Sequence, residues 1–288
     1  MSFKKKLAQL TGIDSNLLPS SYQIIGHVLL LKFMKIKKLS QKKGIALAIL
    51  KLLPYVKTVC EISKVEKEFR VPIVRKLAGD GTVTIHKEHG ILYKLDASKI
   101  MFSKGNLFER QRLISQVKSN ETIVDMFAGI GYFALGLTRK AKKIYAIEKN
   151  PVAFRYLKQN IKLNRIKNIE PVLGDNRKIL LSNTADRIIM GYFRTDRRRQ
   201  LDVPKVRHFV GASSDSEKFL PVAISMLKSK GVIHFHNTYK RNELWNKPIS
   251  QLEKLSGITY SVITKKKIKS VGPNKYHVVL DIQVRKNL

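Results

Sequence analysis

The chain has 288 residues, of which 43% are hydrophobic, so it can form one large domain, or a large and a small one, with packed cores. Lys and Arg number 56 against 21 Asp and Glu, and the net charge of +35 favours a polyanion such as nucleic acid as partner, although heat adaptation also enriches lysine. Cys60 is the only cysteine, which excludes a disulfide framework and a cysteine metal site.

The first 95 residues predict a small, strand-rich α+β region without a catalytic motif. They lack the features of a signal peptide, and the most apolar stretch, 24–33, is too short to span a membrane, so we expect a cytoplasmic protein. This stretch can form one strand, or two strands that meet at Gly26. Helices are expected within 1–18 and at 41–53, strands at 58–62 and 71–77, and a hairpin at 83–87 and 91–95.

Residues 96–288 predict an α/β domain that is organised around 121–150. After a helix that begins near Asn106, residues 123–125 end a short apolar run that is typical of a buried parallel strand. A turn with two glycines, a helix at 132–139 and a strand at 143–147 follow. This order is half of an open nucleotide-binding sheet.

The glycine-rich turn predicts where a ligand binds. Gly129 and Gly131 allow a sharp turn and a close approach of the backbone to a ligand, and Ala134 completes a G-x-G-x-x-A spacing. Glu148 ends the next strand, where an acidic side chain can accept hydrogen bonds from both ribose hydroxyls. Asp125 adds an anion before the glycines, which favours a cationic nucleotide such as S-adenosylmethionine. Asp125 alone could instead cap the helix.

The remaining elements extend the sheet. A third strand at 169–173 ends in Asp175 and Asn176, a pair that can hydrogen-bond an adenine edge. Two last strands, which we expect to be antiparallel, close the domain. The other predictions are a helix at 151–164, a fourth strand at 187–190, a helix at 216–228, a fifth strand at 231–236, and the last strands at 258–266 and 276–284.

The combination D-x-F-A-G-x-G, then a strand-end Glu, then G-D-N resembles the class I S-adenosylmethionine-dependent transferases more than a dinucleotide dehydrogenase. The resemblance implies a class I methyltransferase-type doubly wound sheet with an antiparallel last strand, plus the small N-terminal α+β domain. The expected domains are 1–95 and 96–288.

From about residue 19 onward, the chain is similar to the wyosine-pathway tRNA aminocarboxypropyltransferases of archaea, relatives of the tRNA guanosine N1-methyltransferases. The matching stretches are F-S-K-G-N-x-x-E-R, D-M-F-A-G-I-G-Y-F, I-E-K-N-P, G-D-N-R, I-I-M-G-Y, H-F-H and Y-H-V-V-L-D. M-G-Y stands where many base-methylating enzymes carry N-P-P-Y or N-L-P. This feature favours aminocarboxypropyl transfer.

The resemblance implies that S-adenosylmethionine donates its 3-amino-3-carboxypropyl group to C7 of 4-demethylwyosine in the anticodon loop of tRNA(Phe). No side chain is predicted as a general base, and no metal or membrane is expected. The cofactor-binding residues that it implies are Ser103 and Arg110 for the methionine arm, Asp125, Phe127 and Gly129 in the pocket, Glu148 for the ribose, and Asp175 and Asn176 for adenine.

Arginines after M-G-Y are expected to bind phosphates of the anticodon stem-loop, although a solvated loop is an equal alternative: Arg194, Arg197, Arg198 and Arg199. Residues 265–267 could extend this basic track. His234 and His236 have a spacing compatible with a metal but no evident third ligand, so a structural or substrate-facing role is favoured.

Two alternatives to aminocarboxypropyl transfer stay open. One is a tRNA guanosine N1-methyltransferase, or a relative that methylates the wyosine intermediate. The other is a non-catalytic RNA-binding module on the same fold, against which the intact set of glycines and acidic residues argues.

Overall fold

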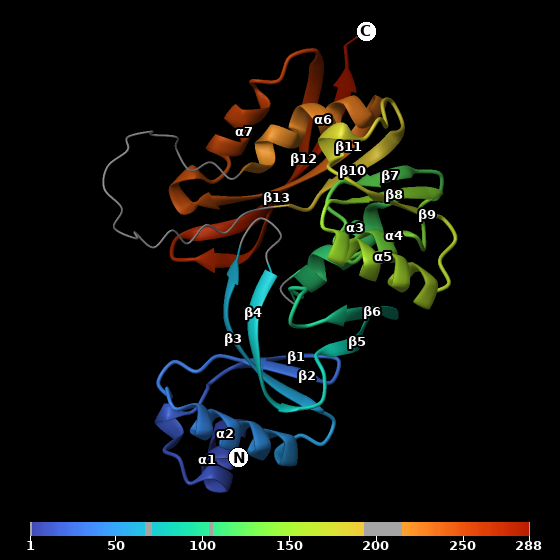
Figure 1. Cartoon of the computed structure of the whole chain (residues 1–288). Helices are drawn as coiled ribbons and strands as arrows, with labels where there is room; N and C mark the ends of the chain where they lie inside the picture. The colour runs from blue at the N-terminus through green and yellow to red at the C-terminus, as the bar shows by residue number, and fades with distance from the viewer. Residues whose placement is uncertain (1, 67–70, 104–105, 193–214, 288) are drawn as a thin grey trace. The chain divides into compact units, whose positions relative to one another are not determined.

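The computed structural model describes residues 2–66, 71–103, 106–192 and 215–287. The chain divides into two compact units (Figure 1). Unit 1 comprises Met1–Ser103 and Lys158–Arg165, and unit 2 comprises Lys104–Leu157 and Ile166–Leu288. The domain boundary at residues 95 and 96 stays a prediction. None of the described helices has the length and apolar character that a membrane crossing needs.

Unit 1 is an α+β unit with a four-stranded sheet in the order β1-β2-β3-β4 and a separate β5–β6 hairpin. The apolar stretch forms two strands that turn at Gly26, one of the two expected arrangements. Two helices cover a core that includes Leu7, Ile45, Ile49 and Val59. The elements are α1 (Phe3–Thr11), β1 (Tyr22–Ile25), β2 (Val28–Leu31), α2 (Leu39–Leu52), β3 (Thr58–Glu66), β4 (Val71–Gly79), β5 (Val83–Glu88) and β6 (Ile91–Asp96).

Unit 2 contains a seven-stranded sheet in the order β12-β13-β11-β10-β7-β8-β9. β13 runs antiparallel to both of its neighbours, while β11, β10, β7, β8 and β9 are parallel, which confirms the expected doubly wound sheet. The strands are β7 (Thr122–Asp125), β8 (Lys143–Glu148), β9 (Ile169–Leu173), β10 (Ala185–Met190), β11 (Leu227–Lys240), β12 (Ile258–Gly272) and β13 (Lys275–Lys286). The helices are α3 (Leu107–Gln116), α4 (Ala134–Leu137), α6 (Leu220–Met226), α7 (Asn246–Leu252) and α5 (Pro151–Leu163), whose residues from Lys158 onward group with unit 1.

The two faces of this sheet differ in chemistry because side chains alternate along each strand. One face is apolar and packs against α6 and α7, with Met190, Phe235 and Leu280 in its core (Figure 1). The opposite face of the same strands carries polar side chains, among them Arg187 and His234, that are also buried. Asp281 of β13 lies on this face as well, and it accepts hydrogen bonds from Arg112 and Gln116 of α3.

Two predicted helices are shorter in the structure. The helix expected at 132–139 is reduced to α4, since Gly131 adopts φ +97° and Gly136 lowers the helix propensity. The helix expected at 216–228 becomes a 3-10 turn followed by α6, which ends at Met226. The next residues join β11, because Leu227 pairs with Ala185 of β10 and the pairing with β13 extends from Lys230 to Lys240.

Candidate active site at the carboxyl edge of the sheet

Four neighbouring parallel strands bring their carboxyl ends to one edge of the unit 2 sheet. β10, β7, β8 and β9 end next to each other, so Asp125, Glu148 and Gly191 meet with the Gly174–Asn176 turn. In open α/β sheets, ligands bind outside the carboxyl ends of the strands. This edge is therefore the candidate site.

Glu148 anchors the glycine-rich turn. Its Oε2 accepts a hydrogen bond of 2.7 Å from the backbone N–H of Gly129, and its Oε1 accepts one of 2.6 Å from Asn150. Gly129 adopts φ +59°, and a Cβ there would lie 2.6 Å from the ring of Tyr132, so glycine is required. Burial raises the pKa of Glu148. Each carboxylate oxygen retains a lone pair for a ligand hydroxyl.

Asp125 is a fully buried carboxyl group at the end of β7. Its Oδ1 accepts a hydrogen bond of 3.3 Å from the N–H of Phe127, while Oδ2 has no hydrogen-bond partner among the described residues. Burial, with a smaller contribution from the charge of Glu148, raises the pKa of Asp125 to about 7. A buried anion with an unused oxygen fits a cationic ligand group such as an ammonium or a sulfonium.

Asn176 and Asp175 form the far end of the edge. Asn176 donates a hydrogen bond of 2.9 Å to the carbonyl of Met126, and its buried Oδ1 has no partner in the described chain. Asp175 accepts two hydrogen bonds from Arg177, of 2.9 and 2.6 Å, which lower its pKa. Asn176 thus offers an unused acceptor to a ligand, whereas the carboxylate of Asp175 already binds Arg177.

Three half-buried aromatic rings lie at the same edge. Phe127 stacks on Tyr192 with ring centroids 5.0 Å apart, and Phe219 meets Phe127 edge-on at 4.9 Å. The guanidinium of Arg177 lies 5.5 Å from the ring centroid of Phe219. Such a surface can pack against a planar heterocycle.

Ser103 and Arg110, the residues expected at the methionine arm, come from segments other than the ends of these strands. Ser103 belongs to unit 1. Arg110 is a buried side chain of α3 in unit 2. Arg194, Arg197, Arg198 and Arg199 lie outside the described residues.

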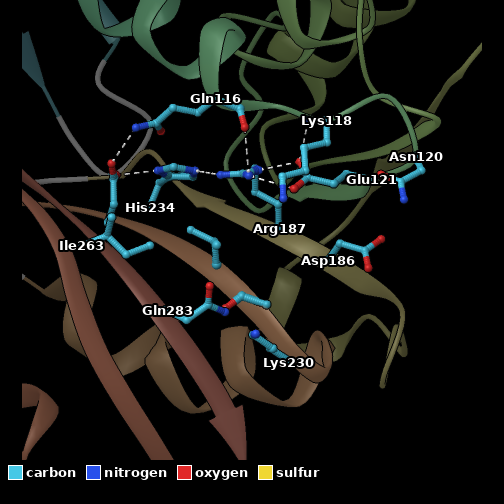
Figure 2. A pocket seen from close by; sticks show the side chains of 13 residues that line it. Gln116, Lys118, Asn120, Glu121, Asp186, Arg187, Lys230, His234, Ile263 and Gln283 are labelled. Carbon is cyan, nitrogen blue, oxygen red and sulfur yellow. Dashed lines mark hydrogen bonds and ion pairs between the residues drawn. The ribbon is translucent and has the colours of Figure 1, made fainter.

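A buried chain of ionic groups beneath α3 was missing from the sequence predictions. Arg187 binds Glu121 through two hydrogen bonds of 2.8 Å and lies 2.7 Å from His234, as Figure 2 shows. His234 bonds Asp281 at 2.6 Å. Asp281 binds Arg112, which also donates two bonds of 2.7 Å to Glu109. We name these groups the α3 ion chain: Glu121, Arg187, His234, Asp281, Arg112 and Glu109.

One end of the α3 ion chain borders a pocket of about 490 Å³ at the amino edge of the sheet (Figure 2). The sequence carries one signal for a member of the α3 ion chain, the charged Asp281 inside the apolar run V-V-L-D-I, but it does not indicate the partners of this carboxylate. His234 is a member of the α3 ion chain, and His236 lies 3.5 Å from Glu109, so both histidines occupy structural positions. Within the described ranges, no three His, Cys, Asp or Glu side chains are arranged to hold a metal.

Comparison with known proteins identifies the family to which this chain is similar. Residues 84–198 match the TRM5/TYW2 methyltransferase domain, and residues 7–82 match the TYW2 N-terminal domain. A curated relative is the tRNA(Phe) (4-demethylwyosine(37)-C(7)) aminocarboxypropyltransferase of Methanocaldococcus jannaschii, 40% identical over 90% of this chain and 96% of that protein.

Two further proteins are similar over most of their length. The tRNA (guanine(37)-N(1))-methyltransferase Trm5b of Pyrococcus abyssi is 34% identical over 93% of this chain and 76% of that protein. The crystal structure of M. jannaschii TYW2 in complex with AdoMet superposes with a TM-score of 0.70 at 35% identity, covering 92% of this chain and all of that one. The chain therefore belongs to the TRM5/TYW2 family, as its motifs predict.

Proposed function

We propose that this chain transfers the 3-amino-3-carboxypropyl group of S-adenosylmethionine to C7 of 4-demethylwyosine in tRNA(Phe). The observation that carries the proposal is the buried carboxyl edge, where Asp125 and Asn176 keep unused oxygens beside the turn that Glu148 anchors. The 40% identity to an aminocarboxypropyltransferase supports this reaction type. M-G-Y in place of N-P-P-Y or N-L-P supports it over methylation.

S-adenosylmethionine would supply an electrophilic γ-carbon. C7 forms a bond to this carbon as the carbon–sulfur bond breaks, methylthioadenosine leaves with the electron pair of that bond, and the proton of C7 passes to water. The residues of the chain position the reactants. Asp125 balances the cationic methionine portion, Glu148 accepts from the ribose hydroxyls, and Asn176 with Asp175 contacts adenine. Phe127 and Gly129 line the pocket.

Two further residues complete the proposed site. Arg110 suits a bidentate contact with the methionine carboxylate, and Ser103 assists it.

The RNA substrate is bound by a group of arginines. Phosphates of the anticodon stem-loop contact Arg194, Arg197, Arg198 and Arg199. The net charge of +35 supports an RNA substrate.

The acceptor base leaves the anticodon-loop stack to reach the pocket. We place the reaction in the cytoplasm. Residues 1–95 form the accessory N-terminal domain, and residues 96–288 form the catalytic domain. The match of residues 7–82 to the TYW2 N-terminal domain supports a separate N-terminal domain.

The test uses S-adenosylmethionine labelled separately in the methyl group and in the carboxyl carbon. Each is incubated with the protein and tRNA(Phe) that carries 4-demethylwyosine, with unmodified tRNA(Phe) as the control. We expect carboxyl label, and no methyl label, in the modified RNA. Methyl label alone would establish a methyltransferase like the Trm5b relative. Tight RNA binding without either label would indicate a non-catalytic module.

A further inference from the structure

A pocket of about 490 Å³ lies at the amino edge of the unit 2 sheet, on the face that carries the α3 ion chain (Figure 2). Its walls come from the end of α3, the turn that follows it, and parts of β10, β11, β12 and β13. The parallel strands begin at this edge and end at the carboxyl edge, so the pocket is separate from the site around Asp125 and Glu148. A volume of this size can hold a small molecule. We name it the amino-edge pocket.

The carboxylates that line the amino-edge pocket are already compensated by cations. Glu121 and Asp281 belong to the α3 ion chain, where each is bonded to an arginine. Asp186 is bound by Nζ of Lys228 at 2.8 and 2.9 Å, and it also accepts a hydrogen bond of 2.8 Å from the backbone N–H of Thr122. These acidic side chains therefore leave little uncompensated negative charge in the pocket.

Two lysines that line the same pocket have no such partner. Lys118 lies in the turn after α3 and Lys230 lies in β11, and both are exposed. Neither ammonium group forms an ion pair or a hydrogen bond within the described part of the chain. Two positive charges thus remain uncompensated, and their field favours an anion in the amino-edge pocket.

The wall of the pocket adds a buried donor. Arg187 lines the pocket and is only 5% exposed. A guanidinium carries five N–H groups. Three of them donate to Glu121 and to the carbonyl of Gln116, and one on Nη1 donates to His234. The second N–H of Nη1 has no acceptor among the described residues, and an unused donor on a buried cation favours an oxygen ligand.

We propose that the amino-edge pocket binds a nucleotide through a terminal phosphate. A phosphate monoester carries a charge of about −1.5 to −2 at pH 7 and offers three acceptor oxygens. Its charge matches the two free ammonium groups of Lys118 and Lys230, and its oxygens can accept from the unused N–H of Arg187. The rest of the volume, bordered by Val232 and by Ile263, which is 57% exposed, takes the ribose and base.

The same phosphate group can come from a free nucleotide or from the end of an RNA chain. An internal phosphodiester carries one negative charge and leaves one of the two ammonium groups uncompensated. A terminal monoester carries nearly two. The charge count therefore favours a monoester over the internal backbone of RNA, and it does not depend on the transfer reaction proposed for the carboxyl edge.

The experiment measures binding to the full chain by calorimetry, with methylthioadenosine in excess so that the carboxyl edge is occupied. The probes are cytidine 5′-monophosphate and cytidine. We expect the monophosphate to bind at least about tenfold more tightly than the nucleoside. Lys118→Gln and Lys230→Gln should each weaken the monophosphate by about tenfold and leave cytidine unchanged. Lys254→Gln is the matched control, because this exposed lysine follows α7 and does not line the pocket.

A steric variant locates the ligand without a change of charge. Val232→Phe adds a ring to the wall of the amino-edge pocket, and it should weaken the monophosphate while the affinity for methylthioadenosine stays the same. A melting curve shows whether this variant is folded. The two lysine variants decide the question where it is not, since both substitutions lie at exposed positions.

Competition by a short RNA at elevated salt, with either a 5′-phosphate or a 5′-hydroxyl, separates the two sources of the phosphate. Competition by the phosphorylated RNA alone would support the site and identify an RNA end as its ligand. Competition by neither RNA would support a free nucleotide.

Three results would overturn the inference. The first is equal affinity for cytidine and its monophosphate. The second is an unchanged affinity for the monophosphate in both Lys118→Gln and Lys230→Gln. The third is equal competition by the two RNAs, which would assign the lysines to the phosphodiester backbone. Failure of the proposed function has a different signature, since carboxyl label would then be missing from RNA whatever the monophosphate affinity.

Discussion

The ring of Phe133 lies against Gly191, where a Cβ would stand only 2.8 Å from Cε2 of the ring. Gly191 follows β10 at the carboxyl edge, in the segment where base methyltransferases carry an N-P-P-Y or N-L-P motif. The aromatic ring of Phe133 thus occupies the space that a side chain at position 191 would need. Any substitution at this position must displace the ring.

Gly191→Asn is therefore expected to abolish aminocarboxypropyl transfer without creating methyl transfer. In the native structure the ring centroids of Phe133 and His236 are 5.6 Å apart, so displacing Phe133 also disturbs this contact. We therefore expect the free energy of unfolding to fall by roughly 1–3 kcal/mol, measured by urea unfolding. Phe133→Leu combined with Gly191→Asn should recover most of that stability. No recovery in the double variant would mean that the ring is not the obstacle.

The raised pKa of Asp125 predicts that the free energy of unfolding depends on pH. Its pKa of about 7 in the folded chain exceeds the ordinary value of 3.8, so the folded state binds the extra proton between these values. Stability without ligand should fall as the pH rises from about 4 to about 7, and the loss should be complete above this range. Asp125→Asn should then be more stable than wild type at pH 8, by on the order of 4 kcal/mol, and similar to it at pH 4.

The same carboxyl group predicts a pH-dependent affinity. A cationic ligand binds the ionised form of Asp125, so the affinity for S-adenosylmethionine should rise as the pH increases through about 7. Neutral methylthioadenosine should show a much smaller rise. Asp125→Asn should remove the pH dependence for both ligands, and a persistent rise in this variant would point to another titrating group.

Glu148→Gln tests the anchor of the glycine-rich turn. A glutamine has one acceptor oxygen, so its amide NH2 would face the N–H of either Gly129 or Asn150. We expect S-adenosylmethionine and methylthioadenosine to weaken by the same factor, about thirtyfold, because both contain the ribose. A loss confined to S-adenosylmethionine would contradict a role at the ribose.

Exposed lysines of β12 are expected to contact RNA phosphates in a salt-dependent way. Lys265 and Lys266 are exposed on this edge strand. Replacing both with Gln should weaken tRNA binding and reduce the slope of log K against log salt by about 1 to 2. Replacing Lys140 and Lys142, which are also exposed, removes the same charge and should leave the slope nearly unchanged.

The parallel half of unit 2 could be predicted because its strands are short apolar runs that end in recognisable polar residues. Asp125, Glu148 and Asn176 were expected together since parallel strands present their carboxyl ends at one edge. α7 was missed, because its seven residues include Pro248 and follow Trp245 at φ +70°. Local sequence carries little signal for such a short helix.

The α3 ion chain could not be predicted from local pattern. Arg112 and Asp281 are 169 residues apart in sequence, and only the return of β13 beside β11 brings them together. A charged residue on a helix is usually solvated, so Arg112 read alone gives no sign of burial.

β12 is the outermost strand of the unit 2 sheet, and its free side pairs with no other strand of the described residues. Its pairing with β13 is interrupted by register shifts, including one between Lys267 and Lys269, and exposed lysines line the same segment. Irregular backbone and repeated positive charge make a poor template for another strand. The edge that can attract a polyanion thus also resists growth of the sheet from one molecule into the next.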